Sequence, residues 1–479
     1  MSVPTVEYRT FQVWIKPGHR LFPYLDETCR HANNLYNTAN FYIRQVFTSM
    51  RLPGACQPLQ RQVMDTICAH MDAMNERRSA KNPCHPFVLP TPEQPFVSYA
   101  FLDALFKVMN QPDYRALPAQ SSQGVLKVVF QNWASFFASM KAYRQHPERF
   151  TGKPKIPGYA RNKVKEVVFS NQECVIKEGK FLKFPRTKMQ LNIGKLGCKN
   201  GKLMQVRGVP RYGNYVVELI FACPLEVPKQ VPVAAPSALL MAIDLGVDNL
   251  ATLVTTTGAQ PMIVKGGIVK SINQYYNKLK AHYTGILRQG KKSQEGQHTS
   301  KRLERLHLRR HHRIKDLFHK ASHHIVRLAV AARIGTIVIG HNAGWKQGPG
   351  MGRRNNQSFC HLPHGQLISM IQYKAAAQRI MVIVTEEAYT SKASFLDYDP
   401  LPCLGEAVTC TFSGKRIHRG LYVSPIGIIH ADVNGAANIL RKVFPNVRAK
   451  RADGIEGLDG NQSVNVSTPQ VLSILRKPG

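Results

Sequence analysis

Acidic residues are scarce in this chain, and their scarcity is its most informative feature. The 479 residues include 29 Asp and Glu against 65 Lys and Arg, which gives a formal net charge of +36. Long apolar runs are also missing. Nowhere do 18 consecutive apolar residues occur, and the opening MSVPTVEYRTFQVWIKPGHR lacks the apolar core of a signal peptide. These absences argue against a membrane-spanning or secreted protein and predict one that works inside the cell.

Paired cysteines are absent as well. The ten cysteines are scattered, and no two of them form a CxxC pair. In a reducing compartment we expect most of them to be small buried hydrophobic residues. The composition is 43% hydrophobic, which excludes disorder and fibrous folds, and the length suggests about three domains.

The positive charge predicts a polyanionic partner. A strongly basic surface attracts polyanions and speeds association with them. We expect nucleic acid rather than a ribosome-type or membrane surface, because the chain is long for a ribosomal protein and no amphipathic Lys-rich helix dominates. The window from Lys265 to Arg327 holds 16 Lys and Arg against three acids. Within it, seven residues are predicted to follow a phosphate backbone: Lys301, Arg302, Arg305, Arg309, Arg310, Arg313 and Lys315.

The first half of the chain reads as strands around a helical block. EYRTFQVWI at 7–15 alternates apolar and polar residues as a half-buried strand does. Helical spacing follows from 24 to about 146, and short strand-like segments with Gly and Pro turns return at 151–235. Strands on both sides of a helical insertion predict one β-barrel interrupted by it.

The second half reads as an α/β unit. Residues 238–255 form two apolar runs joined by a tight turn, which predicts a buried hairpin. Further strands are predicted at 336–340 and 379–387, with helical segments before and between them. From 446 onward periodicity is weak, and we expect a disordered tail.

Carboxylates stand at the ends of these apolar strands. Asp244 closes the run MAI, Glu386 and Glu387 close MVIVT, and Asp432 lies between a strand-like stretch and a helix. If the strands share a sheet, the carboxylates can converge on two Mg²⁺ ions that clamp both oxygens of a phosphodiester displacement. For any one acid alone a cap or turn role is the simpler alternative, and Asp432 could be the N-cap of NGAANILRKV.

Several long motifs resemble a known family. MAIDLGVDNLATL is similar to the first RuvC motif, and GKRIHRGLY with IIHADVNGAANILRKV to the segment carrying the third, of the TnpB proteins of insertion sequences and compact type V CRISPR effectors. VIGHNAGWKQ and EEAYTSKASFLD resemble one branch of that family. The resemblance covers nearly the whole chain and implies that Asp244 and Asp432 are metal ligands.

The chain departs from the common family pattern at its middle motif. Most relatives place a catalytic glutamate where this chain has Gly340-His341-Asn342. In the branch with IGxN, a glutamate of the EExYTSK motif is thought to take over, which implies Glu386 or Glu387. Adjacent residues on a strand face opposite sides, so only one of them should point at the metals, and the sequence does not decide which.

Zinc is a second departure. Many relatives carry two Cys pairs in the insert before the third motif, whereas this chain has only Cys403 and Cys410 there. A four-ligand zinc site is therefore doubtful, although His418 and His430 could complete a degenerate one.

The resemblance implies an RNA-guided DNA endonuclease in a prokaryotic cytoplasm, associated with the nucleoid. A guide RNA would pair with target double-stranded DNA and displace a single strand, a short flanking motif would be read, and a Mg²⁺-dependent RuvC site would cut. The alternative is a nuclease-dead RNA-guided repressor or targeting protein, and a transposase in its own right is a weaker third interpretation. The implied fold is multidomain α+β, with a wedge-like β-barrel at 1–20 and 151–235, a helical recognition domain at 21–150, an RNase H-like α/β RuvC domain at 236–395 and 421–445, a nucleic-acid-binding insert at 396–420 and a tail at 446–479.

Overall fold

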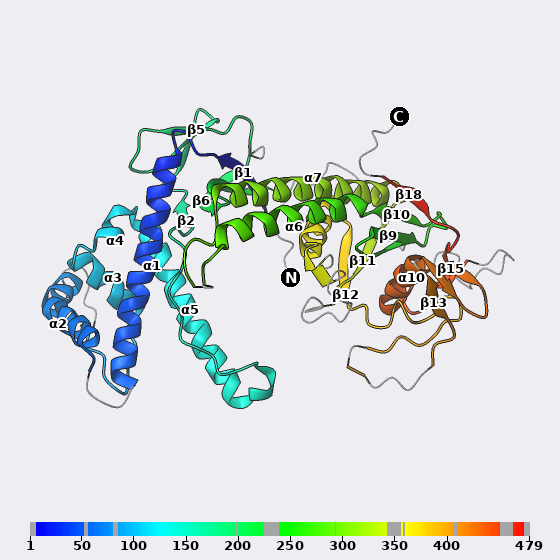
Figure 1. Ribbon diagram of the computed structural model, residues 1–479. Coiled ribbons are helices and arrows are strands. Elements are labelled where there is room, and N and C mark those ends of the chain that lie inside the picture. The colour runs from blue at the N-terminus through cyan, green and yellow to red at the C-terminus, as the bar shows by residue number, and fades with distance from the viewer. Residues whose placement is uncertain are drawn as a thin grey trace. The chain divides into compact units, whose positions relative to one another are not determined.

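The chain folds into two compact units, residues 1–227 and 228–479, as seen in the computed structural model (Figure 1). Among the helices of the described residues, none is long and apolar enough to cross a membrane. The structure describes residues 6–51, 56–79, 85–197, 200–224, 239–292, 294–342, 356–357, 360–403, 405–406, 411–418, 420–450 and 463–473.

The first unit combines a helical block with antiparallel sheets. The predicted strand at 7–15 is confirmed as β1, which pairs with β7 along its whole length. The described pairings give an open four-stranded sheet of order β1-β7-β6-β2 and a separate sheet of β3, β4 and β5, so closure into a barrel stays a prediction. Its helices are α1 (Phe22–Arg51), α2 (Pro58–Ser79), α3 (Tyr99–Val108), α4 (Pro112–Ala116), α5 (Ala119–Gln145) and η1 (Pro147–Arg149), and its strands are β1 (Val6–Ile15), β2 (Val167–Ser170), β3 (Val175–Lys177), β4 (Phe181–Lys183), β5 (Gln190–Asn192), β6 (Lys202–Arg211) and β7 (Asn214–Pro224).

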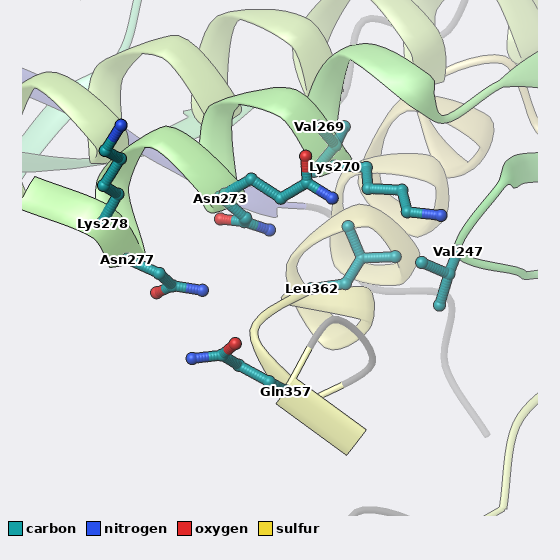
Figure 2. Close-up of a pocket in the computed structure, with 9 residues that line it drawn as sticks. Val247, Val269, Lys270, Asn273, Asn277, Lys278, Gln357 and Leu362 are labelled. Atoms are coloured by element: carbon teal, nitrogen blue, oxygen red, sulfur yellow. The ribbon is translucent and has the colours of Figure 1, made fainter. Parts of the chain in front are cut away.

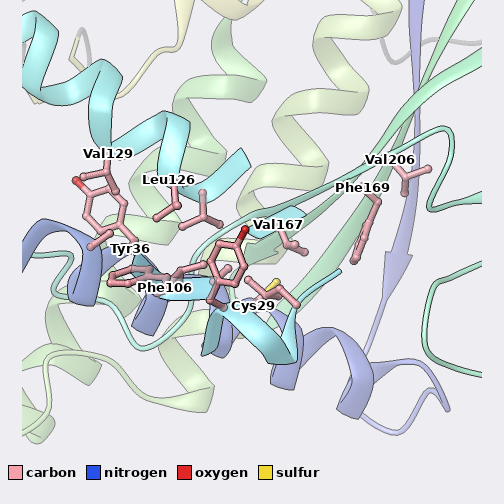
Figure 3. Packing of buried hydrophobic residues seen from close by; sticks show 14 of the residues in the cluster. Cys29, Tyr36, Phe106, Leu126, Val129, Val167, Phe169 and Val206 are labelled. Carbon is pink, nitrogen blue, oxygen red and sulfur yellow. The ribbon is translucent and has the colours of Figure 1, made fainter. Parts of the chain in front are cut away.

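One hydrophobic core joins the helices and strands of this unit. Figure 3 shows Tyr36 of α1, Phe106 of α3 and Leu126 of α5 packed in the same cluster as Val167 and Phe169 of β2. These side chains are almost entirely removed from water. The helical block is therefore anchored on the sheet by burial of apolar surface.

The second unit is built on a mixed sheet of order β12-β11-β8-β9-β10-β18 among the described strands. β8 and β9 form the hairpin predicted at 238–255, and β11 and β12 confirm the strands predicted at 336–340 and 379–387. The strands are β8 (Leu240–Asp244), β9 (Asn249–Thr255), β10 (Met262–Lys265), β11 (Thr336–Gly340), β12 (Met381–Thr385), β13 (Lys415–His418), β14 (Leu421–Val423), β15 (Ile428–His430), β16 (Arg448–Ala449), β17 (Ser463–Val464) and β18 (Gln470–Leu472), and the helices are α6 (Gly267–Arg288), α7 (Lys301–Ala331), α9 (His364–Ala376) and α10 (Ala431–Val443).

Helices cover both faces of this sheet, which explains why its central strands are apolar throughout. Met241 and Ile243 of β8 pack with α6, α7 and α9, whereas Leu240 and Ala242 pack in a second cluster with Ile439 of α10. Successive side chains of a strand point to opposite faces, so both sets are buried.

The prediction of a disordered tail from 446 is wrong for the described residues. β18 pairs in parallel with β10, and β16 pairs with β17. Val447 and Val464 are fully buried in the cluster beneath α10. The partner of β18 lies about 200 positions earlier in the chain, so local periodicity does not reveal this pairing.

Candidate active site

The predicted carboxylates meet at one edge of the mixed sheet. β8 and β12 both run parallel to β11 and flank it, so Asp244 at the end of β8 and Glu386–Glu387 just after β12 emerge at the same edge. Asp432 lies in the first turn of α10, which packs against β8. The topology thus brings together acids that are up to 188 positions apart in the chain.

Gly340, at the end of the strand between them, leaves room for Glu387. A Cβ atom added at Gly340 would lie 2.9 Å from Oε2 of Glu387 and 2.5 Å from Cδ1 of Ile439. A side chain at 340 would therefore require Glu387 and Ile439 to shift from the positions that they hold. The missing side chain at 340 and the glutamate at 387 are therefore two parts of one arrangement, in which Glu387 extends over the end of β11.

The two adjacent glutamates have different surroundings. Glu386 pairs with Lys442 of α10 and accepts a hydrogen bond from the backbone N–H of Ala388 at 2.8 Å. Glu387 lies instead in the field of Asp244. Its backbone N–H donates to Oδ1 of Asn342 at 2.8 Å, so the asparagine of the IGxN motif holds the residue that faces the other carboxylate.

Electrostatics mark Asp244 and Glu387 as strained neighbours. Burial, followed by the nearby Asp432, raises the pKa of Asp244 to about 7. Burial, followed by Asp244 and Glu386, raises the pKa of Glu387 to about 8. Carboxylates forced together without a compensating cation hold their protons more tightly, which is the condition that a bound cation would relieve.

Asp432 is not the N-cap that the sequence allowed. His430 caps α10, because its Nδ1 accepts from the backbone N–H of Asp432 at 3.3 Å. The carboxylate of Asp432 accepts from Nδ2 of Asn249 at 2.6 Å and from the guanidinium of Arg416 at 3.2 Å. Asn249 and Arg416 are therefore site residues that the sequence reasoning missed, since neither carries a signal that local pattern can detect.

One glycine and two asparagines shape α10 around the site. A Cβ at Gly435 would lie 2.8 Å from Oδ2 of Asp244, so only glycine lets this carboxylate approach the helix. Nδ2 of Asn434 donates to the carbonyl of Ala393 and Nδ2 of Asn438 to that of Thr390, at 2.8 and 3.0 Å. These bonds hold the segment after Glu387 on α10, although local sequence alone gives the asparagines no such partner.

The donor chemistry fits a hard divalent cation. Asp244, Glu387 and Asp432 offer only oxygen ligands, and like charges raise the pKa values of the first two. Within the described residues, however, no group of three or more His, Cys, Asp or Glu is close enough to hold a metal ion. Arg416 and Asn249 instead occupy the oxygens of Asp432.

The basic residues predicted on α7 divide into two groups. Arg302, Arg305, Arg309 and Arg313 are exposed and follow one another at spacings of three or four, which forms a ridge along one face. Arg310 is different: it bonds Oδ1 of Asn273 at 2.7 Å and the carbonyl of His361 at 2.6 Å. Of the other two, Lys301 is exposed and Lys315 is half-buried.

The basic residues do not cover the whole surface of α7. The helix buries an apolar face that includes Ile314, Leu317 and Phe318 against the sheet. Apolar residues recur between the basic residues with a period close to 3.6, so they form one buried stripe on the helix. The many basic residues made this stripe hard to see in the sequence.

The degenerate zinc site stays a prediction. Cys403 is exposed, and Cys410 lies outside the described residues. His418 is exposed on β13, whereas His430 serves as the cap of α10. His341 follows β11 and donates its backbone N–H to the carbonyl of Thr385.

Two family models match most of the second unit, and the first of them begins a few residues before it. Residues 222–346 match OrfB of IS605, described as a probable transposase, and residues 364–439 match the Cas12f1-like TNB domain. The first stretch contains Asp244 and Gly340, and the second contains Glu387 and Asp432. A comparison with curated proteins found no match.

Solved structures with similar chains include a Cas12f1–sgRNA–target DNA complex, with 11% identity, a TM-score of 0.29, and coverage of 90% of this chain and 98% of that one. Another is C2c1 of Alicyclobacillus acidoterrestris with single-guide RNA, with 9% identity, a TM-score of 0.31, and coverage of 88% and 69%. TM-scores of this size do not establish a common fold. The two family matches agree with the motifs in the sequence: residues 222–346 are similar to the TnpB-type transposase family, and residues 364–439 are similar to the TNB domain of Cas12f1-like effectors.

Proposed function

We propose that this protein is an RNA-guided DNA endonuclease that hydrolyses phosphodiester bonds at the carboxylate edge of the mixed sheet. The observation that carries the proposal is Glu387 extending over Gly340 toward Asp244. A glutamate supplied from the neighbouring strand replaces the one that relatives carry on β11. Together with Asp432, it restores the three carboxylates that such chemistry requires.

The sheet topology supports an RNase H-like nuclease domain. β8, β9 and β10 form an antiparallel meander, and β11 and β12 extend the sheet in parallel from β8. The acids stand at the carboxyl ends of the parallel strands and on the helix packed across β8. In this proposal the first unit supplies the wedge and recognition domains, and the TNB-like segment forms the insert.

The proposed chemistry assigns separate roles to the side chains. Divalent Mg²⁺, when bound, would stabilise charge on the attacking and leaving oxygens of the scissile phosphate. Asp244, Glu387 and Asp432 would hold it. Asn342 keeps Glu387 in place, and Arg416, at the rim, is placed to meet a phosphate once Asp432 engages the cation.

Guide RNA and target DNA are the proposed partners. The net charge of +36 and the exposed ridge of arginines on α7 suit a phosphate backbone. The similar solved chains are complexes with single-guide RNA and with target DNA. Protein purified from its native cell should carry a structured RNA, and sequencing that RNA would identify the guide. RNA-free protein that binds duplex DNA sequence-specifically without a guide would contradict the proposal.

A nuclease-dead targeting protein is the second candidate. It is favoured by the ion pair between Arg416 and Asp432 and by the lack of a ready three-ligand group in the described part of the chain. Both candidates predict guide-dependent DNA binding, so only cutting separates them.

Cleavage by the guided complex tests the site. Asp244→Ala and Asp432→Ala should each lower cleavage by at least about a thousandfold, the loss expected when several kcal/mol of transition-state stabilisation disappear. Guide-dependent DNA binding should stay nearly intact. Asp316→Ala, which removes an exposed acid of α7, is the matched control. Full cutting by either site variant would exclude this active site, and a parent that binds but never cuts would establish the targeting protein.

A further inference from the structure

A polar cavity lies beside the carboxylate edge, on the flank of α6. Its volume is about 330 Å³, and it lies between α6 and the residues Val247, Gln357 and Leu362 (Figure 2). Its size is at the lower end of the range for small-ligand sites and far too small for a duplex.

One face of α6 forms the polar wall of this cavity. The contributing residues recur at spacings of three and four along the helix, so their side chains lie in one stripe. Among the described residues that line the cavity two are lysines and none is acidic. An anion with polar edges suits such a wall better than a cation or an apolar group. The stripe consists of Lys270, Asn273, Gln274, Asn277 and Lys278.

The orientation of the Asn273 amide can be assigned. The residue is buried, and its Oδ1 accepts from Nε of Arg310 at 2.7 Å. Its oxygen is therefore engaged, and its NH₂ group is turned toward the cavity, as Figure 2 shows. Two N–H donors on a buried wall favour an acceptor-rich ligand such as a phosphate or a base edge.

The two lysines differ in how available they are to bind an anion. Lys270 bonds Oδ1 of Asp248 at 2.6 Å, which neutralises part of its charge. Lys278 is exposed at the rim, and its flexible stem allows the ammonium to swing over the opening. Across from Asn277, the side chains of Val247 and Leu362 offer apolar surface on which a base or sugar can pack.

The position of the cavity indicates which strand it would meet. Val247 is three residues from Asp244, so their Cα atoms are at most about 11 Å apart. A stacked strand advances about 3.4 Å per nucleotide, so this reach corresponds to about three nucleotides. A nucleotide in the cavity would flank the phosphate held at the carboxylate edge.

We infer that this cavity binds one unpaired nucleotide of the DNA strand presented for cutting, with its phosphate at Lys278 and Asn273 and its base against the amides and the apolar floor. The identity of the strand rests on the proposed function. Occupancy of the cavity does not, because binding can be measured without guide or cleavage.

Photocrosslinking to single-stranded DNA tests the inference. The full-length protein, without guide, is irradiated with a short DNA strand that carries one diazirine-bearing nucleotide, and crosslinked peptides are mapped by mass spectrometry. We expect crosslinks within residues 267–288. Lys278→Ala should lower their yield by about tenfold, as the loss of one charge-assisted hydrogen bond to phosphate would. Asn277→Asp, which keeps the side-chain shape but adds negative charge, should lower the yield at least as much.

Lys280→Ala is the matched control, because Lys280 is exposed on the same helix and does not line the cavity. It should leave the crosslink yield within about twofold of the parent. An absent α6 crosslink, an equal loss in all three variants, or crosslinking by an RNA strand alone would overturn the inference. A protein that never cuts under a guide yet gives the expected pattern would refute the endonuclease and leave the cavity assigned. A protein that cuts under a guide but gives no α6 crosslink would support the endonuclease and refute the role of the cavity.

Discussion

Carboxylates are treated in opposite ways in the two units of this protein. In the first unit, Glu218 of β7 is buried but lies between Gln12 of β1 and Arg207 of β6, which donate to it at 2.8 and 2.9 Å. In the second unit, Asp244 and Glu387 face each other, and their pKa values rise. Glu218 is given donors, whereas Asp244 and Glu387 are buried near like charges, a condition that a bound cation would relieve.

The largest effect is expected from the two adjacent glutamates. Glu387→Gln should lower guided cleavage at saturating Mg²⁺ by at least about a hundredfold, because it removes a ligand charge at the site. Glu386→Gln, the matched control, should keep most of the activity. It should lower stability, because Lys442 loses its carboxylate partner. Undiminished cutting by both variants would refute the rearranged site, and loss in Glu386→Gln alone would reverse the assignment.

A smaller effect should follow from the same substitution in the first unit. Glu218→Gln should lower the free energy of unfolding by about 2 kcal/mol, because the partly buried Arg207 keeps its charge without a counterion. Denaturant titration would measure this loss. Cleavage per folded molecule should equal that of the parent, and a specific loss of cutting would place Glu218 in the function instead.

The pH dependence of metal-induced stabilisation sharpens the contrast. Raised pKa values mean that Asp244 and Glu387 bind protons in the folded state at pH values where the unfolded chain has released them. Metal-free stability should therefore fall as pH rises from about 4 to about 8 through these groups, with Glu386, Asp432 and Arg416 facing them.

Added Mg²⁺ competes with those protons, so its stabilising effect should be larger at pH 8 than at pH 6. At ten times its dissociation constant the ion contributes about 1.4 kcal/mol, or a shift in melting temperature of about 3 °C. Thermal unfolding with and without Mg²⁺ at both pH values would measure it. An equal shift at both pH values, or an unchanged shift in Glu387→Gln, would show that the ion binds elsewhere.

The smallest effect is expected at Arg416. Arg416→Ala removes a partly exposed cation that pairs with Asp432 at 3.2 Å. The Mg²⁺ concentration for half-maximal binding should fall by about two- to fivefold, since such pairs contribute less than about 1 kcal/mol. Calorimetric titration of the metal would detect the change. A higher Mg²⁺ requirement in the variant would show that Arg416 assists metal binding.

Much of the fold was accessible from local pattern. Alternation predicted β1, and apolar runs predicted β8, β9, β11 and β12, because a strand or helix that buries one or both faces must carry apolar residues with its own period. The carboxylates at strand ends were visible for the same reason. The strands of the tail were missed because the pairing of β18 with the distant β10 leaves no local pattern. The buried stripe of α7 was missed because many basic residues lie between its apolar residues.

The sequence by itself determined the basic charge, the order of the elements and the set of acids that could form a site. Only the tertiary structure separated the surroundings of Glu386 from those of Glu387, paired Asp432 with Asn249 in place of the cap role that the sequence allowed, and placed Arg310 among protein contacts. Each of these choices depends on partners 37 to 183 positions away. The contacts of such a side chain depend on residues that are distant in sequence but close in the folded structure. Local periodicity carries no information about these contacts.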